Sequence, residues 1–324
     1  PEGPTYFYCF MDFVIGSKSA VLAFFFLQGL VFSALLLRAG VKNGHRPSYW
    51  LSLFVVLCSA YLVPFMAGYQ GWYGKSGYRQ FLFFVPFQHF FLIGPVIYCY
   101  VKSQLNPGWR IGWREAWHFL PGALYLGYSL LIFVTDVFLL DEYYFYADGR
   151  DKDLASWYQI SGLLVMIVYT VLAIRLFGEY RRRIYEELSY AEAVAYRWVG
   201  HFLLALLAIM RLRIFALIFL PEWGSFGRWF PYYTAFGAIA YYIALAGYTN
   251  VVRAVAQQLL RVGNGAPLLE EVPEVVNTPE IEVKSWRPKV IALMEEEKLY
   301  ENPTLTLTDL AANLGVNRRQ ASGI

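Results

Sequence analysis

The residues best suited to contact a nucleic acid lie near the carboxyl end of the chain, between positions 317 and 322. Arginine and glutamine side chains can form paired hydrogen bonds with base edges in the major groove of DNA. The candidate DNA-binding residues are Asn317, Arg318, Arg319, Gln320 and Ser322. The same spacing also fits a helical hairpin that binds another protein, and both interpretations stand at this point.

Two short helices would have to position these side chains. Thr306 and Asp309 fit the N-cap and N3 positions of a first helix, whose apolar face is Leu307, Leu310, Ala311 and Leu314. Gly315 is suited to end that helix in a left-handed conformation, and Asn317 is suited to begin a second one. A helix, a tight turn and a second helix that starts with basic residues form a helix-turn-helix.

A second set of polar residues lies within apolar runs. Arg211 and Arg213 should each cost about 2.5–3.5 kcal/mol to insert into a bilayer. Because they are two positions apart on a helix, they point to different faces, and a single partner cannot serve both. No acidic residue lies at their depth in any apolar run. They either border a hydrated cavity that accepts an anion or bind backbone carbonyls.

Gln88 and His89 form the other polar pair at this depth, one turn before Gly94 and Pro95. They could line a ligand cavity at a helix kink, or they could make hydrogen bonds between helices, as polar residues in membrane bundles often do. The candidate ligand-binding residues are therefore Gln88, His89, Arg211 and Arg213.

The composition predicts a membrane protein. The 324 residues are 58% hydrophobic and only 16% charged, whereas soluble domains carry roughly 25% charged residues. Seven apolar runs are long enough to cross a bilayer, at residues 19–37, 49–68, 81–101, 117–134, 158–178, 198–220 and 230–249. The last run lacks lysine, which excludes a retinal Schiff base, and the three cysteines have no metal-ligand spacing. We expect no catalytic residues, metal or cofactor.

The loop charges predict the orientation. Twelve lysines and arginines follow the first, third, fifth and seventh runs, and six lie on the opposite side. Because basic loops stay in the cytoplasm, we expect residues 1–18 outside and the carboxyl end inside. The outer loop 136–157 is acidic and aromatic, and we interpret it as a solvated loop with rings at the membrane interface, with a cation or ligand cap as the alternative.

The inner segments are expected to be helical before they become extended. Residues 179–197 have an apolar helical face, which predicts a cytoplasmic helix. The helical pattern of the last run continues to Arg261 and breaks at Gly263. Residues 263–282 then contain three prolines and five glutamates, which is typical of an extended, acidic linker.

The carboxyl-terminal segment resembles the first half of an AraC-type DNA-binding domain. The matching residues are Leu293-Met294, Lys298-Leu-Tyr300, Asn302-Pro303, Leu305-Thr-Leu307 and Asp309-Leu-Ala311. The membrane portion is similar to the seven-span halves of membrane-bound AraC-type regulators of Bacteroidetes-like bacteria. That similarity is carried by Gly94-Pro95, Tyr98, Tyr100, His118-Phe-Leu-Pro121, Ser189-Tyr190, Glu192 and Trp198. The resemblance implies a second helix-turn-helix unit beyond Ile324.

The sequence thus predicts an all-α protein: an external segment at 1–18, a seven-helix transmembrane sensor at 19–249, a helical extension and acidic linker at 250–284, and a partial helix-turn-helix domain at 285–324. The expected function is that of a one-component transcriptional regulator in a bacterial inner membrane. Its expected partners are lipid, DNA bound weakly by this tail, a small-molecule or membrane signal, and a second copy of the chain. The alternative is a seven-helix transporter or membrane enzyme with a vestigial or protein-binding tail.

Overall fold

The computed structural model describes residues 16–106, 108–140, 144–187, 197–219 and 226–263, all within one compact unit, Pro1–Ala266. These residues form helices joined by turns and short loops, with no strand among them, so the all-α prediction is confirmed for this part of the chain. The predicted helix-turn-helix domain, with Asn317, Arg318, Arg319, Gln320 and Ser322, lies outside the described residues.

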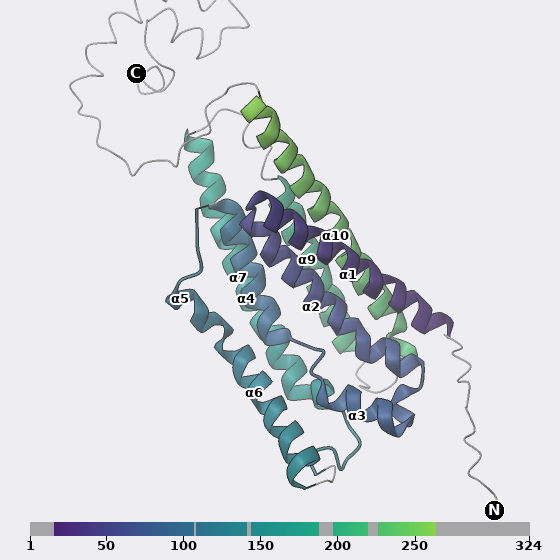
Figure 1. Cartoon of the computed structure of the whole chain (residues 1–324). Coiled ribbons are helices and arrows are strands. Elements are labelled where there is room, and N and C mark those ends of the chain that lie inside the picture. The colour runs from purple at the N-terminus through teal and green to yellow at the C-terminus, as the bar shows by residue number, and fades with distance from the viewer. Residues whose placement is uncertain (1–15, 107, 141–143, 188–196, 220–225, 264–324) are drawn as a thin grey trace, which may run out of the picture. The chain divides into compact units, whose positions relative to one another are not determined.

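Six helical segments are long and apolar enough to cross a membrane. They are α1 (Ser17–Asn43), α2 (Arg46–Tyr69), the run Trp113–Leu139 that contains α5 (Trp113–Ala116) and α6 (Leu120–Val134), α7 (Ser156–Glu187), α9 (Arg197–Phe219) and α10 (Phe226–Gly263). The described part of the chain is therefore that of a multi-pass membrane protein (Figure 1).

The third predicted span is not one helix, which corrects the expectation of seven uninterrupted spans. Residues 81–101 divide between α3 (Ser76–Phe84) and α4 (Phe90–Leu105). Val85 is extended, with ψ 114°, because the ring of the following Pro86 disfavours helical backbone at the residue before it. At 1.5 Å per residue, the 16 residues of α4 extend about 24 Å, less than the ~30 Å hydrocarbon core.

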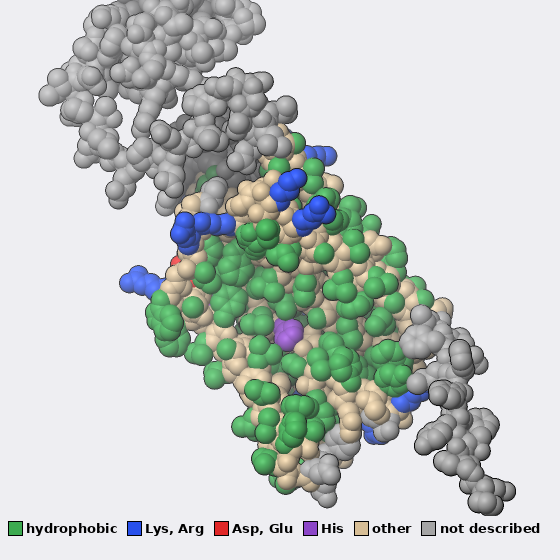
Figure 2. Space-filling model, in the orientation of Figure 1, with side chains coloured by type: hydrophobic (Ala, Val, Ile, Leu, Met, Phe, Trp, Pro, Cys, Tyr) green, Lys and Arg blue, Asp and Glu red, His purple; other side chains and the backbone are tan. Residues whose placement is uncertain are grey.

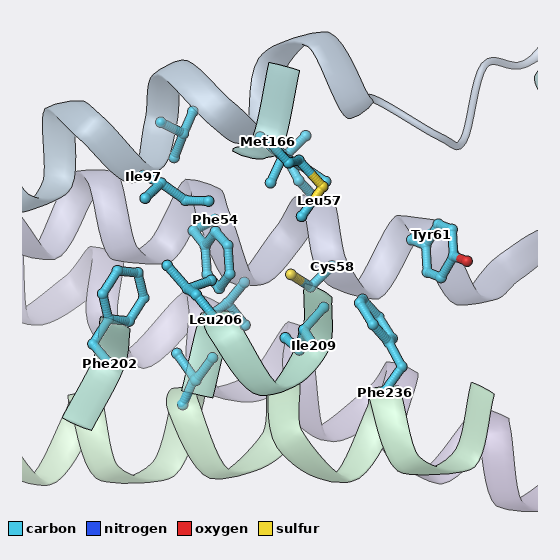
Figure 3. Packing of buried hydrophobic residues seen from close by; sticks show 14 of the residues in the cluster. Phe54, Leu57, Cys58, Tyr61, Ile97, Met166, Phe202, Leu206, Ile209 and Phe236 are labelled. Atoms are coloured by element: carbon cyan, nitrogen blue, oxygen red, sulfur yellow. The ribbon is translucent and has the colours of Figure 1, made fainter. Parts of the chain in front are cut away.

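Helix α2 lies at the centre of the bundle, where it packs against α1, α4 and α10. In its most apolar stretch 67% of the residues are buried, whereas the value for α1 is 22%. Phe54 and Cys58 of α2 pack against Leu206 and Ile209 of α9, as Figure 3 shows. Phe236 of α10 belongs to the same cluster, so the core joins α2 to two helices that come much later in the sequence.

The outer surface of the bundle is apolar. Hydrophobic side chains cover most of the described face in Figure 2, and lysines and arginines lie towards its ends. Leu130 and Ile218, for example, are 62% and 64% exposed. A soluble monomer rarely exposes an apolar surface of this extent, and the distribution fits contact with lipid.

Two predicted extensions of the membrane helices are helical. Helix α10 runs without interruption to Gly263, as the pattern after residue 249 predicts. Helix α7 continues through Glu187, which confirms the first half of the helix expected at 179–197, and residues 188–196 lie outside the described residues.

Candidate functional site

Arg213 is the polar centre of the bundle. It is 3% exposed, whereas Arg211 lies exposed on the surface of α9, so the two arginines do point to different faces. Nη1 of Arg213 donates hydrogen bonds to the hydroxyl oxygens of Tyr61, at 2.7 Å, and Tyr232, at 3.1 Å. Nη2 donates to Oε1 of Gln159, and the guanidinium carbon lies 4.9 Å from the centre of the Phe90 ring.

Gln159 links this arginine to Gln88. Its Nε2 donates to Oε1 of Gln88, at 2.6 Å, and also to the backbone carbonyl of Asp153. Gln88 is fully buried in the break between α3 and α4, and its carbonyl accepts a hydrogen bond from the Tyr158 hydroxyl. Gln88 therefore makes the hydrogen bond between elements that was the alternative to ligand binding.

Asp153 holds the break between α3 and α4 in place. Its Oδ2 accepts hydrogen bonds from the backbone N–H groups of Phe87 and Gln88, both at 3.1 Å. Its Oδ1 accepts one from the Tyr125 hydroxyl at 2.5 Å. The backbone donors freed where the helix is interrupted are thus satisfied by a carboxylate from the loop 136–157. Burial raises the pKa of Asp153 above its ordinary value.

Asp151 and Lys152 complete this region. Oδ2 of Asp151 accepts from the Tyr73 hydroxyl at 2.9 Å, and Oδ1 accepts from the backbone N–H of Asp153 at 3.0 Å. Burial, together with the nearby Asp153 carboxylate, raises the pKa of Asp151 to about 7. Nζ of Lys152 lies 4.4 Å from the ring centre of Tyr146, and burial lowers its pKa to about 8.

The interpretation of loop 136–157 as solvated is therefore wrong for three of its aspartates, while residues 147–150 in its middle are exposed. Asp136, Asp151 and Asp153 are 3%, 6% and 5% exposed, because backbone N–H groups and tyrosine hydroxyls replace water around them. We call Tyr73, Tyr125, Asp151, Lys152 and Asp153 the acidic cap.

The residues that continue from the acidic cap into the bundle form what we call the polar network: Gln88, Gln159, Arg213, Tyr61 and Tyr232. Sequence reasoning selected Gln88 and Arg213 but missed the other three. Gln159 had a usable signal, since it is a polar residue at the start of an apolar run. The two tyrosines had none, because the chain contains 26 tyrosines.

A small cavity of about 20 Å³ lies beside Arg213. Its lining residues come from α2, α4, α7, α9 and α10, and several are drawn in Figure 3: Phe54, Cys58, Tyr61, Phe90, Ile93, Met166, Leu206, Ile209, Arg213, Tyr232 and Phe236. Of the four predicted ligand-binding residues, Arg213 alone lines this cavity. Its size is close to that of one water molecule, so it does not admit an organic ligand in this conformation.

Among the described residues, no group of three or more histidines, cysteines or carboxylates could hold a metal ion. Comparison with protein-family models, with curated proteins and with solved structures found no match.

Proposed function

We propose that this chain is a membrane-embedded, one-component signal transducer and transcriptional regulator. The transmembrane bundle detects a small-molecule or membrane signal, and a cytoplasmic helix-turn-helix of the AraC type binds DNA through Arg318, Arg319 and Gln320. The spacing of residues 306–322 and the resemblance of residues 293–311 to AraC-type domains support the DNA-binding part.

The observation that carries the proposal is the continuity from the acidic cap to α10. The carboxylate of Asp153 holds Gln88, Gln88 and Arg213 share Gln159, and Arg213 donates to Tyr232. Tyr232 lies in the second turn of α10, and that helix continues unbroken to Gly263. At 1.5 Å per residue the distance from Tyr232 to Gly263 is about 47 Å, more than the thickness of the hydrocarbon core.

A rearrangement of the acidic cap would therefore change the hydrogen bonds of the polar network, and through Tyr232 it would change the position of α10 and of the tail that follows it. If Asp153 releases the backbone of Gln88, Gln159 loses one partner and can shift relative to Arg213. The hydrogen bond from Arg213 to Tyr232 then biases the position of α10. Coupling of this kind needs an element with two arrangements, and α10 is that element in our proposal.

The proposed orientation places the acidic cap outside a bacterial inner membrane and the end of α10 in the cytoplasm, as the loop charges predict. Two copies of the chain would bring two tails to neighbouring half-sites on DNA. Dimerisation raises the effective concentration of the second tail, which compensates for the few phosphate contacts that one tail can make.

Recovery of DNA by the full chain tests the proposal. The chain is purified in lipid nanodiscs and mixed at physiological salt with sheared genomic DNA of its source, and the bound fragments are sequenced. We expect a small set of enriched fragments, and we expect the double variant Arg318→Ala, Arg319→Ala to lose that enrichment. Equal recovery of all fragments, or the same set with the double variant, would contradict the DNA-binding role.

The alternative of a transporter has one observation in its favour, the interrupted segment between α3 and α4. Transporters often form substrate sites at broken helices, where free backbone groups bind the cargo. Here the N–H groups of Phe87 and Gln88 already bind Asp153 of the same chain. The break is thus filled by the protein itself, which favours a structural role over a transport site.

A further inference from the structure

Arg211 is an exposed charge on the outer face of a membrane helix. It lies 14 residues after Arg197, where α9 begins, and eight residues before Phe219, the last described residue of α9. At 1.5 Å per residue these intervals are about 21 Å and about 12 Å, so Arg211 lies within the ~30 Å hydrocarbon core. In a bilayer its exposure places the guanidinium against lipid, where a charged side chain is unfavourable.

Arg211 is poorly placed to reach the lipid headgroups. The Cα–Cβ bonds of an α-helix tilt towards its amino-terminal end, so the side chain leaves α9 in the direction of Arg197. The boundary on that side is the more distant one, at about 21 Å. Arg175 of α7 is also exposed, but it lies about 28 Å from the start of α7 at Ser156, close to one core thickness. Arg175 is therefore near a membrane boundary, whereas Arg211 is not.

The described residues supply no counter-charge to Arg211. Within those ranges the ion pair is that of Lys102 on α4 and Glu115 on α5, at 2.9 Å. The face of α9 around Arg211 is otherwise apolar, and Leu204 and Phe215 are 65% and 57% exposed. Because a charge surrounded by apolar groups needs an opposite charge or hydrogen-bond partners, this face is incomplete when lipid alone covers it.

The same face offers a place where another helix can approach closely. Leu204, Ala208, Arg211 and Phe215 recur three and four positions apart, so they share one side of α9. Every helix surface has this spacing, and what distinguishes this one is the charge and the small, exposed Ala208 one turn before it. Small residues let two membrane helices come close, and polar groups then bond between the helices.

A second copy of the chain does not fit this face. In a two-fold symmetric pair the same surface of both copies meets. The two Arg211 guanidiniums would then face each other across the contact, and like charges in apposition are unfavourable. The face instead fits a helix whose charge is opposite to that of Arg211.

We propose that the outer face of α9, formed by Leu204, Ala208, Arg211 and Phe215, is a docking surface for a transmembrane helix of another protein that carries an aspartate or glutamate at the depth of Arg211. The carboxylate neutralises the guanidinium and accepts its paired hydrogen bonds. The inference goes beyond the proposed function and does not depend on DNA binding by the tail, so either can fail without the other.

Association with synthetic transmembrane peptides in liposomes tests the surface. Three polyleucine peptides with lysines at both ends carry aspartate, asparagine or leucine at the central position. The full chain and the peptide carry a donor and an acceptor fluorophore, and energy transfer is followed as the ratio of peptide to lipid rises. We expect the aspartate peptide to associate about tenfold more tightly than the leucine peptide. Equal energy transfer with these two peptides would overturn the proposal, and the asparagine peptide should fall between them.

Variants locate the contact. Arg211→Leu should reduce association of the aspartate peptide to that of the leucine peptide. Ala208→Phe keeps the charge but prevents close approach, and it should also lose the preference for aspartate. Arg175→Leu is the matched control, because it removes an exposed arginine near a membrane boundary, and it should keep the preference. A preference for aspartate that persists in Arg211→Leu or in Ala208→Phe would place the contact elsewhere and overturn the proposal.

Cysteine cross-linking tests whether a second copy occupies the face instead. Phe215→Cys and Leu164→Cys are compared in a chain whose Cys9 is replaced by serine, because Phe215 of α9 and Leu164 of α7 are both 57% exposed. We expect equally slow oxidative cross-linking of two chains at both positions. Cross-linking that is much faster at Phe215→Cys would show a second copy on this face and overturn the proposal.

Discussion

Asp153 in the acidic cap and Arg213 in the polar network are both buried, but they differ in how completely their hydrogen bonds are satisfied. Asp153 accepts three hydrogen bonds, from two backbone N–H groups and one tyrosine, so both of its oxygens have partners. Arg213 has partners for two of its three nitrogens and faces a cavity. Both oxygens of Asp153 are thus bonded, whereas Arg213 keeps one buried donor without a partner among the described residues.

This difference predicts that Asp153 and Arg213 contribute unequally to the stability of the bundle. A carboxylate that satisfies backbone donors at a helix break is difficult to replace, because those donors have no alternative inside the protein. An arginine bound by neutral acceptors contributes less net stability, since its desolvation opposes its hydrogen bonds. We therefore expect replacement of the cap aspartate to cost more free energy of unfolding than replacement of Arg213.

Replacement of Asp153 should have the largest effect. Asp153→Ala leaves the N–H groups of Phe87 and Gln88 and the Tyr125 hydroxyl without their acceptor. We expect a loss of about 5 kcal/mol in the free energy of unfolding, the lower end for three hydrogen bonds to a charged group at about 1.5–3 kcal/mol each. Denaturant unfolding in micelles measures it. Asp148→Ala is the control, because Asp148 is exposed in the same loop. Equal losses of unfolding free energy in Asp153→Ala and Asp148→Ala would contradict a special structural role for Asp153.

The acidic cap should also make stability depend on pH. The pKa of Asp151 is raised to about 7 in the fold, whereas an unfolded aspartate titrates near pH 4. Between these values the folded state holds a proton that the unfolded state has lost, so stability falls as pH rises from about 4 to about 7 and then levels off. We expect a fall of a few kcal/mol, because each pKa unit corresponds to about 1.4 kcal/mol, and a smaller one in Asp151→Asn. A stability that rises over this interval would show the sign to be wrong.

Replacement of Arg213 should change stability less than replacement of Asp153. In Arg213→Met an apolar chain of similar length occupies the position, the amide oxygen of Gln159 loses its donor, and Tyr61 and Tyr232 keep the hydrogen bond between their hydroxyls. We expect a loss of about 1–3 kcal/mol, the cost of one buried polar group left without a partner. The same denaturant titration checks this expectation. A loss as large as that of Asp153→Ala would mean that Arg213 stabilises the fold as much as the cap aspartate does, which would contradict the expected difference between them.

Arg211 should have the smallest effect on the folded bundle. Because it is exposed on α9, Arg211→Leu breaks no interaction of the polar network. Arg211 is unfavourable for membrane insertion instead. Its replacement should lower the free energy of inserting this span by about 2.5–3.5 kcal/mol at mid-span. Insertion assays should thus improve while the unfolding midpoint stays unchanged. A clear drop in the midpoint would assign Arg211 a contact that its exposure does not indicate.

Helix extents were predictable where one local signal decides them. The continuation of α10 through Gly263 follows from the helical pattern after residue 249. The break before α4 also has a local signal, because Pro86 disfavours helical backbone at Val85. A hydropathy profile does not show this signal, because a single proline hardly changes the mean of an apolar run. The prediction of an uninterrupted third span failed because length and apolarity were weighed without backbone geometry.

The partners of the polar residues could not be predicted in the same way. The opposite faces of Arg211 and Arg213 follow from the 100° step of a helix. The acceptors Tyr61 and Gln159 lie 152 and 54 positions away, on helices whose rotation is set by packing of the whole bundle. The burial of Asp151 and Asp153 depends on Tyr73 and Tyr125 in the same manner. Such contacts are long-range and leave no periodic signal.

The central claim, that the polar network positions α10, is tested most directly by a distance between α10 and the neighbouring helix α1. Spin labels at Val41 of α1 and Val252 of α10 use exposed sites, with Cys9 replaced by serine; Cys58 and Cys99 are buried. Gln159→Leu removes the link between Gln88 and Arg213, and Arg211→Leu is the control. Pulsed electron paramagnetic resonance should give a shifted or broadened distance distribution in Gln159→Leu and an unchanged one in the control. An identical distribution in Gln159→Leu would show that α10 is positioned without the network and would contradict the account.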